Sequence, residues 1–391
     1  MLNSRFSPWP SFTEEEAQAV QRVLLSNRVN YWTGEEGRRF EEEFAAFSDS
    51  QYAIALANGT VALELALRAG GIGPGDDVVV TPRTFIASAS AIVTVGARPV
   101  FADVDTDSQN ITVETIRAAL TERTKAVICV HLAGWPCDMP TIMALAEQEK
   151  LFVIEDCAQA HGARIAGRSV GSFGHVGAWS FCQDKIMSTG GEGGMVTTND
   201  RERWSRMWSF KDHGKSWEAV YEREPPPGFR WLHESFGTNF RMTEMQSVIG
   251  RIQLARMPAW TARRQHNAQI ITDVARRYPC VRAPQPADAF EHACYKGYLF
   301  VEPAHLKPDW SRDRILEALV DEGVPAMSGS CSEVYREKAF DEGNLRPKDR
   351  LPVAAELGDT SLMFPVHPTL TDDEMQTIAS GLERVLARAS R

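Results

Sequence analysis

The chain has 391 residues, more than a usual single core, so we expect two domains. Its composition, 43% hydrophobic and 24% charged, is ordinary for a soluble globular protein. A formal net charge of −10 gives no electrostatic reason to expect a nucleic-acid partner or a membrane partner. The 7 cysteines have no CxxC spacing, which is simplest to explain in a reduced, cytoplasmic protein.

The first half of the chain alternates between strand-like and helical segments. Residues 10–46 have a charged helical pattern, which is interrupted at 29–34. Strands are expected at 52–57, 78–81, 98–102, 126–132, 151–155, 178–181 and 194–198, with helices at 60–69, 84–95 and 140–148. Short apolar strands that alternate with helices predict an α/β fold with a mostly parallel sheet covered by helices.

The pattern changes after residue 199. A long helix is expected at 243–275, where Thr243 and Gln246 have capping-box spacing and Pro258 allows a kink. A smaller unit follows, with a strand at 297–301 and a helix at 312–322. We therefore divide the chain into a large α/β domain, residues 1–250, and residues 251–391, which hold the linking helix and a smaller C-terminal α+β domain.

Lys185 and Asp156 carry the main chemical signal. The lysine lies between an apolar strand and the glycine-rich loop 190–194, and the aspartate ends another strand. A lysine amine can hold a carbonyl cofactor as a Schiff base and later act as a base. A carboxylate can keep a pyridine nitrogen protonated, which makes the ring an electron sink. Alone, the lysine could be a solvated surface residue and the aspartate an ordinary cap at a strand end. Together they predict a pyridoxal 5'-phosphate (PLP) enzyme.

Candidate phosphate ligands occur where a strand runs into a helix. Asn58-Gly59-Thr60 would offer helix N-terminal amides, close backbone approach and a hydroxyl. The same three residues also make a good turn and N-cap, so alone they are a weak signal. Ser180, five residues before the lysine, adds a second hydroxyl.

Other side chains could contact the cofactor ring. Phe85, at another strand-to-helix junction, could stack on a flat ring, although a core phenylalanine is the commoner occurrence. Gln159 and His161 follow Asp156 and could reach the ring oxygen and the ring face.

Two other classes of site fit less well. Cys157 and His161, with Cys137 and His131, supply elements of a zinc site without paired CxxC or HxxxH spacing, so we predict no metal. Glycines 171, 174 and 177 have GxxGxxG spacing, which is not the dinucleotide fingerprint, so a Rossmann dehydrogenase is not expected.

Taken in order, a set of motifs resembles the DegT-type sugar aminotransferases, which are fold-type I PLP enzymes. The set comprises Asn58-Gly59-Thr60, Thr84-Phe85, residues 155–159 (EDCAQ), Ser180-Phe181, Lys185, residues 191–194 (GEGG) and residues 237–241 (GTNFR). The resemblance extends from about residue 10 to residue 380. It implies Lys185 as the Schiff-base lysine, with Asp156 at the pyridine nitrogen and Gln159 at the ring oxygen. It also implies Phe85 against the ring, with Gly59, Thr60 and Ser180 at the phosphate.

The resemblance also implies partners. Asn239 matches an asparagine that reaches the phosphate in the neighbouring subunit, so a homodimer is expected. L-glutamate is the usual amino donor of such enzymes, and a nucleotide-linked keto sugar is the usual acceptor.

Departures from the common family pattern bear on the acceptor. Residues 183–190 (QDKIMSTG) look nearer to relatives that aminate C4 than to those with a Pro-Thr-Lys-Asn loop, which often act on 3-keto sugars. We therefore expect a nucleotide-linked 4-keto-6-deoxy sugar, for surface-polysaccharide or glycoside biosynthesis. Tyr335 stands in an altered substrate loop, and Lys211 and His213 could meet phosphates, or could belong to a solvated charged loop.

Other functions remain open. The acceptor could be a 3-keto sugar, a cyclitol or a free keto sugar acid. A PLP-dependent sugar dehydratase shares the fold, although histidine replaces the lysine in such relatives. The third alternative is a non-catalytic sensor or regulator with a PLP fold.

Overall fold

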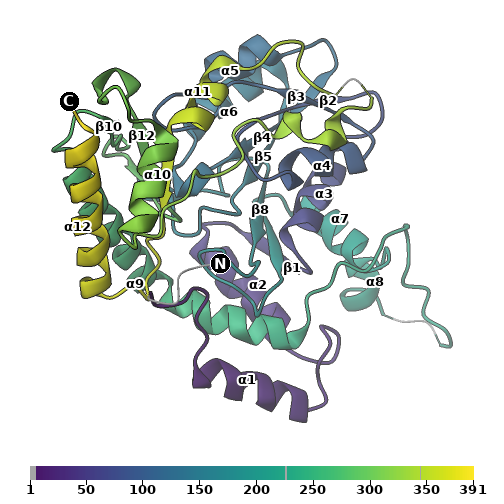
Figure 1. The fold of residues 1–391 in the computed structure, drawn as a ribbon. Helices are drawn as coiled ribbons and strands as arrows, with labels where there is room; N and C mark the ends of the chain where they lie inside the picture. The colour runs from purple at the N-terminus through teal and green to yellow at the C-terminus, as the bar shows by residue number, and fades with distance from the viewer. Residues whose placement is uncertain (1–5, 225–226, 344) are drawn as a thin grey trace.

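The computed structural model describes residues 6–224, 227–343 and 345–391, and Figure 1 shows the fold. Its central sheet has seven strands in the order β1-β9-β8-β5-β4-β2-β3. They are β1 (Tyr52–Leu56), β2 (Asp77–Val80), β3 (Arg98–Phe101), β4 (Thr124–Val130), β5 (Phe152–Asp156), β8 (Val176–Ser180) and β9 (Gly194–Thr198). Only β9 runs against its neighbours β1 and β8. The predicted mostly parallel α/β sheet is confirmed.

Helices cover both faces of this sheet because its strands are apolar on both sides. Along β2, Val78 and Val80 belong to one core and Val79 to the other. The helices α3 (Gly59–Ala69), α4 (Ala87–Thr94) and α7 (Arg201–Lys211) pack in the first core. The helices α2 (Glu36–Phe47), α5 (Val113–Ala119) and α6 (Met139–Glu149) pack in the second. The continuous apolar runs of the sequence are thus strands that are buried on both faces.

A third core lies in the C-terminal part of the chain. An antiparallel sheet, ordered β10-β12-β13, is formed by β10 (Val281–Arg282), β12 (Gly297–Val301) and β13 (Ser361–Phe364). The helices α10 (Arg312–Asp321) and α12 (Asp372–Ala389) pack on it, and α11 (Pro352–Thr360) precedes β13. The short strands β11 (Phe290–Glu291), β6 (Arg164–Ile165) and β7 (Arg168–Ser169) form a further small sheet.

The long helix α9 (Glu244–Ala275) runs along one side of the molecule and connects these parts (Figure 1). It begins with the expected capping box, in which Thr243 accepts from the Gln246 amide and Gln246 accepts from the Thr243 amide. It contacts α1 (Glu14–Leu25) and α2 near its start and α12 further on. The predicted domain boundary at residue 250 falls inside this helix and stays a prediction.

Arg83 joins the end of β2 to the C-terminal unit. Its guanidinium is fully buried and donates to Gln109 at 2.8 Å, to Ser332 at 2.6 Å and to Ser361 at 3.1 Å. Because Ser361 begins β13, this one side chain ties the loop beside the sheet edge to the small sheet.

The helix expected from residue 84 begins only at Ala87, since residues 81–86 and their proline form an irregular turn.

Several elements were not predicted from the sequence. They are α5, α7, the one-turn α8 (Trp217–Tyr221), α11, α12 and the short strands β6, β7, β10, β11 and β13. Short 3-10 turns occur at Leu132–Gly134, Pro303–His305, Val334–Arg336 and Lys338–Phe340. None of the helices in the described part of the chain is both long enough and apolar enough to span a membrane.

A close contact between α9 and α2 gives a test of the packing. A Cβ added at Gly250 would lie 2.5 Å from the ring of Phe40. We expect Gly250→Ala to lower the free energy of unfolding by about 1–3 kcal/mol, because overpacking outweighs the gain in helix propensity. Gly73→Ala is the control, since its new Cβ would meet only the Val95 carbonyl at 3.8 Å. Equal denaturation midpoints for the two variants would contradict this account of the α2–α9 contact.

Candidate active site

Most of the predicted cofactor residues line one cavity of about 1140 Å³. The cavity lies at the carboxyl ends of β5 and β8, where open α/β sheets bind ligands. Its lining includes Asn58, Gly59, Thr60, Phe85, Asp156, Gln159, Ser180 and Lys185. Residues that are far apart in the sequence therefore meet around a single space.

Asp156, the last residue of β5, is 4% exposed. Its Oδ2 accepts a hydrogen bond from the Ser88 hydroxyl at 2.7 Å, and its Oδ1 accepts from the Ala158 amide at 3.1 Å. Burial raises the pKa of this carboxyl, and the two hydrogen bonds and the nearby Lys185 only partly oppose the rise. An incoming cationic group would therefore be strongly favoured beside it.

Lys185 lies on the turn between β8 and β9, and its main chain is held on both sides. The Lys185 amide donates to the Cys182 carbonyl at 3.1 Å, and the Trp9 indole donates to the Lys185 carbonyl at 2.8 Å. Three residues on, the Ser188 amide donates to Gln253 of α9 at 2.8 Å. The amine itself lies 5.5 Å from the centroid of the Tyr295 ring.

The start of α3 forms a cradle that only glycine allows. A Cβ at Gly59 would lie 2.6 Å from the Cβ of Ser180, and one at Gly194 would lie 2.3 Å from the Asn58 carbonyl. The Asn58 side chain caps the helix by accepting from the Val61 amide at 3.0 Å. A helix N-terminus leaves its first amides without acceptors in the helix, and these attract phosphate oxygens.

Gln159 is oriented by the loop next to it. Its Oε1 accepts from the Ala133 amide at 2.8 Å, so its side-chain NH2 is left as a donor. Ala133 has a φ of 56°, and its carbonyl accepts from the Tyr295 amide at 2.8 Å. The segment that carries Tyr295 and the loop that orients Gln159 are thus fixed to each other.

The structure does not bring the four candidate substrate residues to this cavity. His161 is fully buried against Phe44, Trp179 and Phe181, and burial lowers its pKa to about 3. Lys211 is fully buried, with its amine 3.6 Å from the Tyr31 ring centroid and 3.7 Å from Glu41.

The other two lie elsewhere as well. His213 is exposed on the loop after α7. Tyr335 is 3% exposed and donates its hydroxyl to Glu333 at 2.6 Å. The 327–335 segment does reach the cavity, but through other residues, among them Met327, Ser330 and Cys331.

Asn239 is exposed and lies outside the cavity of its own chain.

Several lining residues were not predicted from the sequence: Trp9, Ser88, Asp184, Tyr295, Lys296 and His367. Thr84 lies in the turn before α4 and Ser88 in the first turn of α4, and their hydroxyls are 2.9 Å apart. Asp184 directly precedes Lys185, and the others come from distant segments with no local signal.

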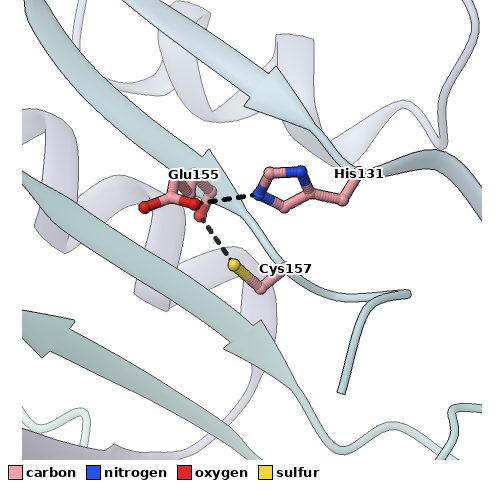
Figure 2. Close-up of side chains that lie close together, drawn as sticks. All are labelled: His131, Glu155 and Cys157. Atoms are coloured by element: carbon pink, nitrogen blue, oxygen red, sulfur yellow. Dashed lines mark hydrogen bonds and ion pairs between the residues drawn. The ribbon is translucent and has the colours of Figure 1, made fainter. Parts of the chain in front are cut away.

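Two residues of the zinc site considered from the sequence, His131 and Cys157, lie beside Glu155 in a hydrogen-bonded network (Figure 2). Glu155 accepts from His131 Nε2 at 3.0 Å and from the amides of Gly171, Phe173 and Gly174 at 2.7, 2.8 and 2.6 Å. His131 Nδ1 accepts from the Cys137 amide at 2.9 Å. Burial raises the pKa of the Cys157 thiol well above its usual value. With its carboxylate oxygens occupied and its thiol protonated, the group suits structure better than metal binding, and the absence of a metal stays a prediction.

Comparison with known proteins identifies the family. Residues 10–383 match the DegT/DnrJ/EryC1/StrS aminotransferase family. The chain belongs to this family. It is a PLP-dependent sugar aminotransferase, as the motifs predicted. An aminotransferase structure from Streptococcus pneumoniae in its PMP form, with 25% identity and a TM-score of 0.87, covers 98% of this chain and 99% of its own.

Individual relatives cover nearly the whole chain. The solved aminotransferase from Psychrobacter cryohalolentis has 62% identity and a TM-score of 0.96, over 98% of this chain and 99% of its own. The UDP-N-acetyl-3-dehydro-alpha-D-glucosamine 3-aminotransferase of Acidithiobacillus ferrooxidans is 35% identical over 98% of this chain and 96% of its own. The GDP-perosamine synthase of Escherichia coli O157:H7 is 34% identical over 95% of this chain and 96% of its own.

The cavity fits the family's cofactor on its own geometry. Glycines leave the start of α3 open enough to admit a phosphate. Among the described residues, the buried Asp156 carboxylate has no cationic hydrogen-bond partner, as a site for a ring nitrogen would need. The Lys185 amine borders the same space.

The network around Glu155 makes a prediction that separates structure from metal binding. Glu155→Gln sets a side-chain NH2 against backbone donors, so we expect a loss of about 2–4 kcal/mol in the free energy of unfolding. Thermal denaturation with and without a chelator is the measurement. A chelator that lowered the wild-type melting temperature would instead reveal a bound metal at this cluster.

Proposed function

We propose that this aminotransferase transfers an amino group from L-glutamate to a nucleotide-linked 4-keto-6-deoxy sugar, for surface-polysaccharide or glycoside biosynthesis. The observation that carries the proposal is the meeting of a lysine, a buried carboxylate and a helix N-terminus around one cavity. Two relatives are named for a UDP-linked and a GDP-linked sugar, which supports a nucleotide-linked acceptor.

Bound PLP supplies an electron sink and holds the amino group between donor and acceptor. We assign Lys185 as its covalent anchor and as the base that moves protons at the reacting carbon. Asp156 pairs with the ring nitrogen, and the free NH2 of Gln159 donates to the ring oxygen. Phe85 packs on the ring. The phosphate is held by Asn58, Gly59, Thr60 and Ser180, with Asn239 from the neighbouring subunit.

The position of amination rests on the lysine loop. Residues 183–190 resemble those of relatives that act at C4, and this supports a 4-keto acceptor. A 3-keto sugar is the second candidate, because the Acidithiobacillus relative is named as a 3-aminotransferase. A dehydratase is disfavoured because the chain keeps its lysine where such relatives have histidine.

We propose a homodimer whose active sites lie between the subunits. Phe85 lines the cavity yet is 66% exposed in the single chain. On the segment before Asn239, Phe229, Trp231 and Phe236 are 73%, 82% and 101% exposed. Large aromatic side chains of this kind commonly become covered at an interface. A second subunit would cover them and bring in its Asn239.

We place the enzyme in the cytoplasm. All 7 of its cysteines are unpaired, as is usual in a reducing compartment.

The two halves of the reaction test the proposed function separately. We expect L-glutamate to convert the bound cofactor to its amine form, seen as a change in absorbance. A nucleotide-linked 4-keto-6-deoxy sugar, but not its 3-keto counterpart, should then restore the original spectrum. Lys185→Ala should slow the glutamate step by about 100-fold or more, whereas Lys125→Ala, on the surface, should leave it unchanged. A protein that binds no PLP, or that glutamate leaves unchanged, would refute the proposal.

Mixing two inactive variants tests the shared site. In a heterodimer of Lys185→Ala and Asn239→Ala, one of the two sites receives a lysine from one chain and an asparagine from the other. After refolding an equal mixture, we expect about a quarter of wild-type activity, because half the dimers are mixed and each has one intact site. Activity no greater than that of the separate variants would show that Asn239 does not act across the interface.

A further inference from the structure

Lys296 is a second amine in the wall of the active-site cavity, and nothing assigned so far uses it. It directly precedes β12, and the residue before it, Tyr295, donates its amide to the Ala133 carbonyl at 2.8 Å. Ala133 is the residue that orients Gln159. The position of Lys296 is therefore fixed relative to the cofactor-facing side of the cavity.

Lys296 and Lys185 border the same aromatic side chain. The two amines approach the ring of Tyr295, at 4.8 Å for Lys296 and 5.5 Å for Lys185. In the described part of the chain, the Lys296 amine donates no hydrogen bond and has no carboxylate within 4.0 Å. A partly buried ammonium without an anionic partner is costly, and it has three donors to offer to a ligand.

The surroundings hold more positive charge than negative charge. Arg264 is fully buried, and its Nε and Nη2 have no hydrogen-bond partner among the described residues. Burial lowers the pKa of Lys296 to about 8, and Arg264 and Lys185 add to this against the pull of Asp184. Asp184 is the nearby anion and already accepts from the Tyr295 hydroxyl at 2.6 Å. This side of the cavity thus holds three basic side chains, Lys185, Lys296 and Arg264, and one acidic one, Asp184.

The reaction brings in two kinds of anion, and distance separates them. The α-carboxylate of an amino acid is bonded to the carbon that carries the amino group, so it must lie near the Lys185 amine. The diphosphate of a nucleotide sugar is separated from a C4 keto group by the sugar ring. Because Lys296 and Lys185 approach the same tyrosine ring, the nearer anion fits this position.

We propose that Lys296 binds the α-carboxylate of the amino donor. This inference rests on the proposed function and deepens it, since it names a residue that selects amino acids as donors. A charge-assisted hydrogen bond from Lys296 would orient the donor carbon toward the Lys185 amine. The buried Arg264 adds positive potential from the interior, and its guanidinium carbon lies 4.8 Å from the centroid of the Trp9 ring.

The test compares Lys296→Gln with Lys296→Arg, and with Lys125→Gln on the surface as the control. We expect Lys296→Gln to keep its bound cofactor and its melting temperature. The glutamate concentration that gives half-maximal rate in the donor step should rise about 10- to 100-fold, as for a lost charge-assisted hydrogen bond. Lys296→Arg should recover most of this loss, and Lys125→Gln should match the wild type.

Two further readouts isolate the carboxylate. Maleate has carboxylates but no amino group, so its dissociation constant reports anion binding without turnover. This dissociation constant should rise in Lys296→Gln by a similar factor. The acceptor step, started from the amine form of the cofactor with the keto sugar that the wild type aminates, should stay within about 3-fold of wild type.

The outcomes separate the two proposals. A slowed acceptor step with a normal donor step would overturn the assignment and give Lys296 to the nucleotide sugar. Equal losses in both steps, or no loss in either, would also overturn it. A wild-type protein that glutamate does not convert would refute the proposed function itself, and the donor role of Lys296 with it.

Discussion

Asp156 holds its carboxylate at the carboxyl end of β5, in the interior of the protein. Burying a charge is costly unless a partner compensates it, and here the hydrogen-bond donors are a hydroxyl and an amide, both neutral. The charge is therefore only half compensated in the protein alone. In the proposed function, a protonated ring nitrogen would complete this compensation, and cofactor binding would then stabilise this edge of the sheet. Ser88, near the start of α4, supplies the hydroxyl that donates to this carboxylate.

Glu155, the residue before Asp156 on β5, is also a buried carboxylate, but its oxygens accept more hydrogen bonds. Successive side chains of a strand point to opposite faces, so Glu155 enters the other core. There its oxygens accept from His131 (Figure 2) and from three backbone amides of the turn at residues 171–174. A fully satisfied carboxylate fixes a turn, whereas a half-satisfied one awaits a ligand. The two adjacent acidic residues thus differ in the number of hydrogen-bond donors around them, which supports a structural role for Glu155 and the cofactor role proposed for Asp156.

Much of this fold follows from local pattern. The strands at 194–198 and 297–301 have the predicted bounds, because short apolar runs between turn residues leave little freedom. Most of the predicted cofactor residues meet around one cavity because they lie at strand ends or on the segments that follow them, and the carboxyl ends of parallel strands meet at one edge. Helix α4 is shorter than predicted because the turn before it takes up the first three residues of the predicted helix.

The remaining parts of the site depend on contacts that local pattern does not contain. Lys211 looks like a loop cation in the sequence, but Tyr31 and Glu41, from the N-terminal region, enclose it. His161 follows a loop motif, yet an aromatic cluster buries it. Trp9 and Tyr295 enter the site from segments far apart in the chain. Burial of this kind is set by tertiary packing, so charge and spacing alone do not show which polar residues line the cavity.

The main chain around Lys185 is fixed, while its amine must move. In the proposed function, the amine forms a bond to the cofactor and later acts as a base, so it would occupy more than one position. Trp9 holds the carbonyl of Lys185, and Gln253 holds the amide of Ser188, so the backbone does not supply this movement. The four-carbon stem of lysine supplies it instead, with rotations that leave the cradle at Gly59 undisturbed. Anchoring the backbone from two distant segments keeps each position of the amine defined relative to Asp156 and the phosphate cradle.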